Sequence, residues 1–299
     1  MHKLLSGELS VEQITVEITG LPKALQGTKI AQLSDLHFDG LRLSNEMLAE
    51  AIAICNQARP DLVALTGDLV TDDPAPIQEL AGQLQQLSSR CGTYAVLGNH
   101  DIYPAGSREQ ITQALEQVGI QVLWNQITYP FGPDLPVVGL ADFWSKQFQP
   151  ATVMAQLDPD KPRLVLSHNP DTAAPLSQWR IDLQLSGHTH GGQIALPGIG
   201  PIPTWYQMFR SYIPKALRPW IPYMREDCYR VVRHWEWAQG FHQIPMQTAA
   251  AQSPTEPSSG QRPAYNQLYV NRGLGTYLPG RLFCPPEVTL ITLVASVAS

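Results

Sequence analysis

Polar residues able to bind metal ions follow five apolar runs in the first two thirds of the chain. KIAQLS leads into Asp35-Leu36-His37, and LVALT leads into Gly67-Asp68. Carboxylate, amide and imidazole donors without thiolates suit divalent ions such as Mn, Fe, Zn or Mg. Because these donors outnumber what one tetrahedral ion needs, the pattern predicts two metal ions. The candidate ligands are Asp35, His37, Asp68, Asn99, His168, His188 and His190.

The motifs differ in how specific each is. Asp-x-His alone usually marks a turn, and Gly-Asn-His-Asp could also be only a turn, since these residue types favour turns. Five such motifs in this order, each after an apolar run, are a much stronger signal. We expect the Asp68 carboxylate to bridge the two ions and Asn99 to add a neutral oxygen. His188 and His190 would point to opposite faces of an extended segment, so the following glycines should turn the chain.

The elements that carry these motifs read as alternating strands and helices. Open α/β sheets place ligands at the carboxyl ends of strands, which is where the motifs lie. Alternation of this kind indicates an α/β fold with layered sheets. Strands are predicted at 14–18, 29–33, 62–65, 93–97, 137–140, 163–166, 181–185 and 288–294, and helices at 45–58, 74–87 and 107–118.

Helix boundaries are marked by several signals. Asp73 is a candidate N-cap residue with Pro74 at the first helical position. Ser107 and Gln110 have the spacing of a capping box, and Gly119 is placed to end that helix.

Composition limits the class of protein. With 299 residues, 43% of them apolar and 15% charged, the chain can bury a large core, and we expect a single catalytic domain over 1–299. The formal charge of −6 argues against a general nucleic-acid coat protein and gives no strong nucleic-acid signal. Four scattered cysteines favour a reducing, cytoplasmic environment. No secretory signal or membrane-spanning run is visible.

Residues 198–264 break the alternation and read as an insertion that ends in a mobile linker. Within it, residues 205–237 form an aromatic and basic segment in an otherwise acidic protein. Such a segment suits peripheral contact with a membrane or a lipid-bearing substrate, or else a lid or subunit contact. Its aromatic and basic residues include Trp205, Tyr206, Phe209, Arg210, Tyr212, Lys215, Arg218, Trp220, Tyr223, Arg225, Arg230, Arg233, Trp235 and Trp237.

The order of the motifs resembles that of the calcineurin-like metallophosphoesterase family. The family pattern D-x-H, G-D, G-N-H-D, a lone H and G-H-x-H is matched across residues 35–190. The resemblance implies two mixed β-sheets packed as a sandwich flanked by helices, with a dinuclear metal site at the carboxyl ends of the strands. Where many members read G-D-x-x-D, this chain has Thr71 followed by Asp72 and Asp73.

The resemblance also implies a role for each site residue. One ion would be bound by Asp35, His37, Asp68 and His190. The second would share Asp68 as the bridge. Its other ligands would be Asn99, His168 and His188. His100 would contact the phosphate and protonate or stabilise the leaving oxygen, and Asp101 would orient His100.

A closer resemblance links the chain to the YkuE/YaeI-like bacterial branch, through segments such as QLSDLHF, LQLSGHTHGGQ and LYVNRGLGT. It implies hydrolysis of a phosphodiester, phosphomonoester or pyrophosphate by in-line attack of a metal-bridging hydroxide, with manganese favoured. A lipid-linked or nucleotide-sugar substrate such as UDP-2,3-diacylglucosamine fits, as does a location at the inner face of the membrane. The alternatives are a nuclease, a cyclic-nucleotide phosphodiesterase, and a non-catalytic metal-binding scaffold, which would be expected to have lost ligands. Oligomeric state is not predicted.

Overall fold

The structure is a computed structural model and describes residues 5–214, 217, 232–247 and 264–296. Two six-stranded sheets face each other, with strand orders β1-β14-β2-β3-β4-β5 and β12-β13-β9-β8-β7-β6. The first comprises β1 (Ser10–Ile18), β2 (Lys29–Leu33), β3 (Leu62–Leu65), β4 (Thr93–Ala95), β5 (Ile120–Val122) and β14 (Glu287–Ala295). The second comprises β6 (Gln126–Thr128), β7 (Val137–Gly139), β8 (Leu164–Leu166), β9 (Leu183–Ser186), β12 (Gly240–Pro245) and β13 (Tyr265–Val270).

Both sheets contain parallel and antiparallel pairs. In the first, β14 pairs parallel with β1 and antiparallel with β2. In the second, β9 pairs parallel with β8 and β13, while the edge strands β6 and β12 are antiparallel to their neighbours. The predicted sandwich of two mixed sheets is therefore confirmed.

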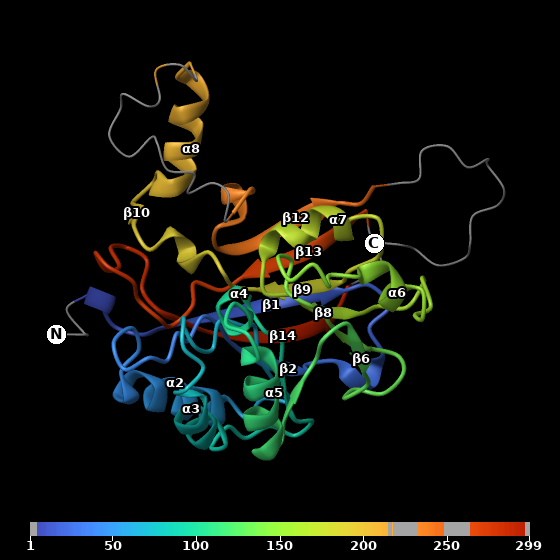
Figure 1. Cartoon of the computed structure of the whole chain (residues 1–299). Helices are drawn as coiled ribbons and strands as arrows, with labels where there is room; N and C mark the ends of the chain where they lie inside the picture. The colour runs from blue at the N-terminus through green and yellow to red at the C-terminus, as the bar shows by residue number, and fades with distance from the viewer. Residues whose placement is uncertain (1–4, 215–216, 218–231, 248–263, 297–299) are drawn as a thin grey trace.

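Alternating side chains build the core on both faces of each sheet. On β3, Leu62 and Ala64 face the second sheet, whereas Val63 and Leu65 pack under the helices. Figure 1 shows helices on both outer sides of the sandwich. The first sheet is covered by α2 (Asn45–Ala58), α3 (Ile77–Leu84) and α5 (Ser107–Gln117), and the second by α6 (Pro150–Met154) and α7 (Ala173–Leu176).

Several elements have the predicted bounds and others do not. β2, β3 and α2 begin and end at the predicted residues. The edge strands β5 and β6 and the two late strands β12 and β13 were not predicted. The predicted cap of α5 is wrong: Gly106 precedes the helix at φ 78°, and the hydroxyl of Ser107 instead donates to the carbonyl of Asp101 at 2.6 Å.

The start of α3 also differs from the prediction. The helix begins at Ile77 after Pro76, and Asp73 lies outside it. The Asp73 carboxylate accepts a hydrogen bond from the backbone N–H of Ala75 at 2.9 Å, so it forms a local turn before the helix.

Part of the range 198–264 belongs to the second sheet. β12 is the edge strand of that sheet, and its Ile244 is buried against Leu268 and Val270. The described remainder contains the hairpin β10 (Ala195–Leu196) and β11 (Gly200–Pro201), α8 (Ile202–Tyr212), which projects from the sandwich in Figure 1, and a short 3-10 turn at Trp235–Trp237. The expected linker at 248–263 lies outside the described residues, as do Lys215, Arg218, Trp220, Tyr223, Arg225, Arg230 and the side chain of Arg210.

The two ends of the projecting segment meet at its base. The Thr204 hydroxyl donates to the carbonyl of Trp235 at 3.1 Å. The carboxylate of Asp171 accepts from the backbone N–H groups of Arg233 at 2.7 Å and His234 at 2.9 Å. Thr189, which stands between two predicted ligands, donates its hydroxyl hydrogen to the Ala238 carbonyl at 2.6 Å. The segment is thus fastened to the body of the domain beside the candidate site.

No helix among the described residues combines the length and apolar character needed to cross a bilayer.

Candidate metal centre

The backbone turns sharply at the predicted ligands. Five of the seven have positive φ: Asp35 at 49°, His37 at 44°, Asp68 at 52°, His188 at 72° and His190 at 51°. Residues with a Cβ seldom adopt this region, which costs on the order of 1–3 kcal/mol each and is concentrated at functional sites. These turns direct side chains from several strand ends into one place. The expected turn after the histidines is present at Gly191, at φ 60°, but it begins at the histidines themselves.

Glycines let the ligand segments approach one another closely. A Cβ on Gly187 would lie 2.2 Å from an Asp35 carboxylate oxygen, and one on Gly98 would lie 2.2 Å from Asp68 Oδ1 and 2.7 Å from His168 Nε2. Only a hydrogen atom fits at these two positions. The Gly in each of the motifs Gly-His-Thr-His and Gly-Asn-His-Asp is therefore required by space.

The first group of donors comprises Asp35, His37 and His190, all buried, with ligand atoms within 4.8 Å of one another. Nε2 of His37 lies 3.0 Å from Nε2 of His190, and the latter atom lies 3.7 Å from Asp35 Oδ1. The segment from β2 and the segment from β9 therefore supply one compact set of nitrogen and oxygen atoms.

The second group comprises Asp68, His168 and His188, again within 4.8 Å and buried. His168 Nε2 lies 3.1 Å from both His188 Nδ1 and Asp68 Oδ2. The same Oδ2 lies 3.6 Å from His37 Nε2 in the first group. Asp68 Oδ1 accepts the backbone N–H of His100 at 2.9 Å, so Oδ2 is the oxygen that faces both groups.

The chemistry of these donors fits a pair of divalent cations. Two imidazole lone pairs about 3 Å apart repel each other unless a proton or cation lies between them, and this arrangement occurs once in each group. Asn99 adds a carbonyl oxygen, Oδ1, that is buried and has no hydrogen-bond partner. A buried acceptor without a partner costs free energy that a bound cation would recover.

Backbone carbonyls fix the tautomers of two of the histidines. His168 Nδ1 lies 2.8 Å from the carbonyl oxygen of Thr66, and His190 Nδ1 lies 3.2 Å from that of Gly275. A carbonyl can only accept, so each neutral imidazole carries its hydrogen on Nδ1 and turns the Nε2 lone pair toward the donor groups. Both rings are held in the form that binds a metal ion.

Electrostatics in the site follow from burial and from Asp68. Burial lowers the pKa of His37 to about 3, so this imidazole is neutral at pH 7. Burial alone would raise the pKa of Asp68, but the facing His168 and His37 hold it well below its usual range. Burial raises the pKa of Asp35 to about 7, with the neighbouring Asp68 charge adding to the effect. Burial alone would lower the pKa of His168, but the facing Asp68 raises it to about 10. In the metal-free pocket an ionised Asp68 therefore faces a charged His168, whereas His37 stays neutral.

His100 lies at the edge of this pocket. A ring nitrogen of His100 lies within 4.8 Å of the ligand nitrogen of His37 and of a carboxylate oxygen of Asp68. Its side chain is 25% exposed, whereas those of His37 and His168 are fully buried. A carboxylate oxygen of Asp72, one of the acidic residues that follow Thr71, lies 3.4 Å from His100 Nδ1. A histidine in this position can reach a bound substrate.

The contacts of Asp101 differ from those expected. Its carboxylate accepts backbone N–H groups of Leu69 at 2.8 Å, Val70 at 3.1 Å and Gly98 at 2.9 Å. The carboxylate next to the His100 ring belongs to Asp72, not to Asp101. Asp101 therefore ties the loop that carries Asp68 to the turn that carries Asn99. Burial, with Asp68 nearby, raises its pKa to about 7.

Two further residues near the site were missed by the sequence analysis. Asp142 follows the apolar run Val137–Leu140 as the ligands follow theirs, and that placement could have identified it. It is 1% exposed, its Oδ2 has no hydrogen-bond partner, and burial raises its pKa to about 6. Tyr277, whose hydroxyl lies 3.1 Å from His37 Nδ1, follows no motif that would have indicated it.

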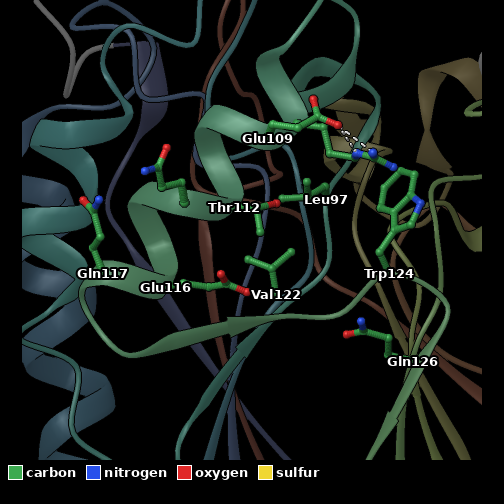
Figure 2. A pocket seen from close by; sticks show the side chains of 10 residues that line it. Leu97, Glu109, Thr112, Glu116, Gln117, Val122, Trp124 and Gln126 are labelled. Atoms are coloured by element: carbon green, nitrogen blue, oxygen red, sulfur yellow. Dashed lines mark hydrogen bonds and ion pairs between the residues drawn. The ribbon is translucent and has the colours of Figure 1, made fainter.

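One surface hollow lies away from these groups. It has a volume of about 740 Å³ and lies between α5 and the edge strands β5 and β6, and none of the predicted ligands lines it. Figure 2 shows Glu109 and Trp124 at one end of the hollow. Arg108 there is paired with Glu109 and stacks on the Trp124 ring. The hollow carries no convergent donor set and does not compete with the metal centre as the reactive site.

Comparison with known proteins gives one family match. The family model described as calcineurin-like phosphoesterase matches residues 28–192, which span every predicted ligand. The match therefore covers both donor groups and His100.

Three curated relatives match most of the chain. The phosphodiesterase YaeI of Escherichia coli (strain K12) is 31% identical over 89% of this chain and 82% of its own length. The uncharacterized metallophosphoesterase YkuE of Bacillus subtilis (strain 168) is 28% identical over 93% of this chain and 83% of its own. The UDP-2,3-diacylglucosamine pyrophosphatase LpxG of Chlamydia muridarum (strain MoPn / Nigg) is 27% identical over 91% of this chain and 86% of its own.

Proposed function

Because this chain belongs to the calcineurin-like phosphoesterase family, we propose that its two buried donor groups hold a pair of divalent metal ions. The enzyme is a metal-dependent hydrolase of phosphoric ester or pyrophosphate bonds. The observation that carries the dinuclear proposal is the position of Asp68 Oδ2, 3.6 Å from His37 Nε2 and 3.1 Å from His168 Nε2. The proposed ligands are Asp35, His37, Asp68 and His190 for one ion and Asp68, Asn99, His168 and His188 for the other.

The residues of the chain have separate tasks in the proposed reaction. When bound, two divalent ions would acidify a water molecule for in-line attack and offset negative charge on the phosphoryl oxygens. His100, at the open edge, holds the proton that the leaving oxygen takes up. A carboxylate oxygen of Asp72 lies 3.4 Å from its Nδ1, and this Nδ1 has no hydrogen-bond partner among the described residues. Asp101 keeps Asp68 and Asn99 in register through its three backbone contacts.

Manganese is the ion we propose for this site. Its ligands are carboxylate, amide and imidazole groups, the donors that suit Mn and related ions, and no cysteine takes part. The buried Cys284 is close to the backbone of His190, but its thiol faces the carbonyl oxygens of His190 and Gly191 at 3.4 and 3.5 Å.

A lipid-linked phosphodiester or pyrophosphate is the proposed substrate class. The relatives include one named a phosphodiesterase and one named a UDP-2,3-diacylglucosamine pyrophosphatase. Large apolar side chains are exposed on the loop that follows Tyr277 and on α8: Leu278 at 82%, Phe283 at 63%, Phe209 at 64% and Trp205 at 43%. Exposed apolar groups on a segment whose sequence is rich in basic residues suit an interfacial lipid, so peripheral membrane contact through residues 205–237 is part of the proposal.

Metal analysis followed by a substrate panel tests the proposed activity. The purified protein should contain about two ions per chain after loading with Mn²⁺. It should hydrolyse bis-p-nitrophenyl phosphate and a nucleotide-sugar pyrophosphate more readily than single-stranded DNA. Asp68→Ala should lose metal and activity, whereas Asp134→Ala, which removes an exposed carboxylate paired with Lys161, should keep both. Full activity of Asp68→Ala would refute the bridging assignment.

Vesicle flotation tests the membrane contact. The full chain should bind vesicles of phosphatidylglycerol and phosphatidylcholine, and the double substitution Trp205→Ala and Phe209→Ala should weaken this binding. Tyr129→Ala, which removes another exposed aromatic side chain, serves as the control. Equal binding by all three proteins would count against an interfacial role for α8.

A further inference from the structure

We infer that the hydroxyl of Tyr277 both positions His37 for metal binding and donates a hydrogen bond to the phosphoryl group of the substrate. This inference rests on the proposed function, because it takes His37 as a ligand. Neither the motifs nor the family match places Tyr277 in the site, since the match ends at residue 192.

Tyr277 covers the first donor group. Its ring centroid lies 4.9 Å from that of His37, 5.4 Å from that of His190 and 6.3 Å from that of His100. The guanidinium carbon of Arg42 lies 4.4 Å from the same ring centroid. Tyr277 therefore stands between a fixed cation and the histidines of the site.

The loop that carries Tyr277 is fastened to the site. The backbone N–H of Tyr277 donates to Gln193 Oε1 at 2.7 Å, and that of Gly275 donates to the carbonyl of Asp35 at 2.7 Å. A Cβ on Gly275 would lie 2.9 Å from this carbonyl oxygen and 3.0 Å from the Cβ of His37, so the loop lies directly against the ligand segment. The tyrosine is consequently held in place with the ligands it touches.

The hydrogen bond to His37 has one direction when that ring binds a metal ion. His37 Nε2 faces the donor groups, so its lone pair must be on Nε2 and its hydrogen on Nδ1. In His168 and His190 the Nδ1 hydrogen is donated to a backbone carbonyl, which can only accept. In His37 it goes to the oxygen of Tyr277, 3.1 Å away. The Tyr277 oxygen thus accepts the Nδ1 hydrogen of His37, as backbone carbonyls do for His168 and His190.

When His37 donates in this direction, the hydroxyl hydrogen of Tyr277 is not used in the bond between the two side chains. A hydroxyl can accept and donate at once, unlike the carbonyls at His168 and His190. Tyr277 is half-buried, and its ring centroid lies 6.3 Å from that of His100 at the open edge of the pocket. An oxygen of a phosphoryl group held between the donor groups and His100 is within reach of this O–H. The Arg42 cation over the ring draws π-electron density toward itself and makes the phenolic O–H a stronger donor.

A purely structural tyrosine makes a different prediction. If the ring only packs on His37, then phenylalanine should replace it without consequence for metal or phosphate. If the oxygen works as inferred, its removal leaves the Nδ1 hydrogen of His37 without an acceptor and the phosphoryl group without a donor. Tyr277→Phe separates these cases because it removes one oxygen and keeps the ring.

The test measures metal and phosphate binding separately. Mn²⁺ affinity is measured by competition with a chelating dye, and inorganic phosphate is then titrated as a competitive inhibitor at saturating Mn²⁺. Tyr277→Phe should weaken the binding of one of the two ions by about 10- to 100-fold. The inhibition constant of phosphate should rise by roughly 5- to 10-fold. Tyr129→Phe, which changes an exposed tyrosine, should match the wild type in both measurements.

The outcomes distinguish the inference from the function beneath it. Wild-type Mn²⁺ affinity and phosphate inhibition in Tyr277→Phe would overturn the inference while the function stands. A change in metal affinity with unaltered phosphate inhibition would overturn the donor role alone. Failure of the wild-type protein to bind Mn²⁺ would overturn the proposed function and this inference with it. The metal-free variant should melt about 2–4 °C below the metal-free wild type, since the ring is retained and one hydrogen bond is lost.

Discussion

Replacing Gly98 by alanine tests whether the close packing of the ligand segments is what assembles the metal centre. The position has φ −96°, which any residue can adopt, so the substitution adds a methyl group without imposing backbone strain. That methyl carbon would lie 2.2 Å from Asp68 Oδ1, 2.6 Å from the backbone nitrogen of Asp68 and 2.7 Å from His168 Nε2. Two of the three contacts are with proposed ligand side chains.

The size of the effect follows from these distances. The optimal separation of non-bonded heavy atoms is about 3.5 Å, so Asp68 or His168 must move by about 1 Å. Overpacking of this kind costs about 1–3 kcal/mol, which corresponds to a loss of about 2–6 °C in melting temperature. A displacement of about 1 Å at a reacting centre can lower the rate by about 100-fold. The ion proposed to bind Asp68, His168 and His188 should be weakened more than the other ion.

The assay compares Gly98→Ala with a matched substitution. Gly82→Ala adds the same methyl group on α3, where nothing lies within 4 Å, and should be neutral or slightly stabilising. For each protein we would measure Mn²⁺ per chain after dialysis, the melting temperature, and turnover of bis-p-nitrophenyl phosphate. Gly98→Ala should retain about one ion instead of two and lose about 100-fold in turnover.

Gly98→Ala that bound two ions and turned over within about twofold of the wild type would refute the reasoning, because the added methyl would then have found room. A large fall in melting temperature in Gly82→Ala would also refute it, since the cost would not depend on the contacts.

Three further predictions concern the same site. His100→Ala should abolish hydrolysis of bis-p-nitrophenyl phosphate while the metal content measured by mass spectrometry stays near two, because the proposed role of this imidazole is to supply a proton and the proposed ligand sets do not include it. Removing the ions with EDTA should lower the melting temperature, by an amount equivalent to about 2.7 kcal/mol if they were present at 100 times their dissociation constant, and re-addition of Mn²⁺ should restore it. Asp142→Asn should stabilise the metal-free protein at pH 7 by up to about 3 kcal/mol and have little effect at pH 4, as followed by thermal melts. The sign follows because burial raises the pKa of Asp142 from 3.8 to about 6, so the folded state favours the protonated carboxyl and stability falls as pH rises between these values. Equal melting temperatures of the two proteins at pH 7 would contradict the last prediction.

The mixed-sheet fold class was predictable because buried parallel strands appear in the sequence as short, continuous apolar runs. Runs such as Leu62–Leu65 are apolar throughout, as strands covered on both faces must be, and β3 has the predicted bounds. The strands β5 and β6 have three residues each and lie at sheet edges, where partial exposure removes the continuous apolar run. β12 was hidden for a related reason, since its exposed and buried residues alternate and it directly follows the aromatic segment.

The site residues that directly follow a strand could be predicted from the sequence. Those that reach the site through a long loop could not. His168 stands directly after a buried run, so its position follows from sheet geometry. Asp72 and Tyr277 approach the same pocket through loops whose path is set by close contacts such as those of Gly275. No local pattern encodes such contacts. The partners of Asp101 were likewise beyond prediction, since the family resemblance implied the His100 ring, whereas backbone N–H groups of one other loop and of its own turn surround the carboxylate.

The closure of the projecting segment at Thr204 and Trp235 has a consequence for how this protein can diversify. A segment whose ends already meet can be lengthened, shortened or exchanged at small entropic expense, about 0.6 kcal/mol for each doubling of its length. Because Asp171 and Thr189 hold its base, such exchange would leave the metal-binding turn in place. Exchange of the sequence between Thr204 and Trp235 is therefore expected to leave the metal-binding residues in place while it changes the surface beside them.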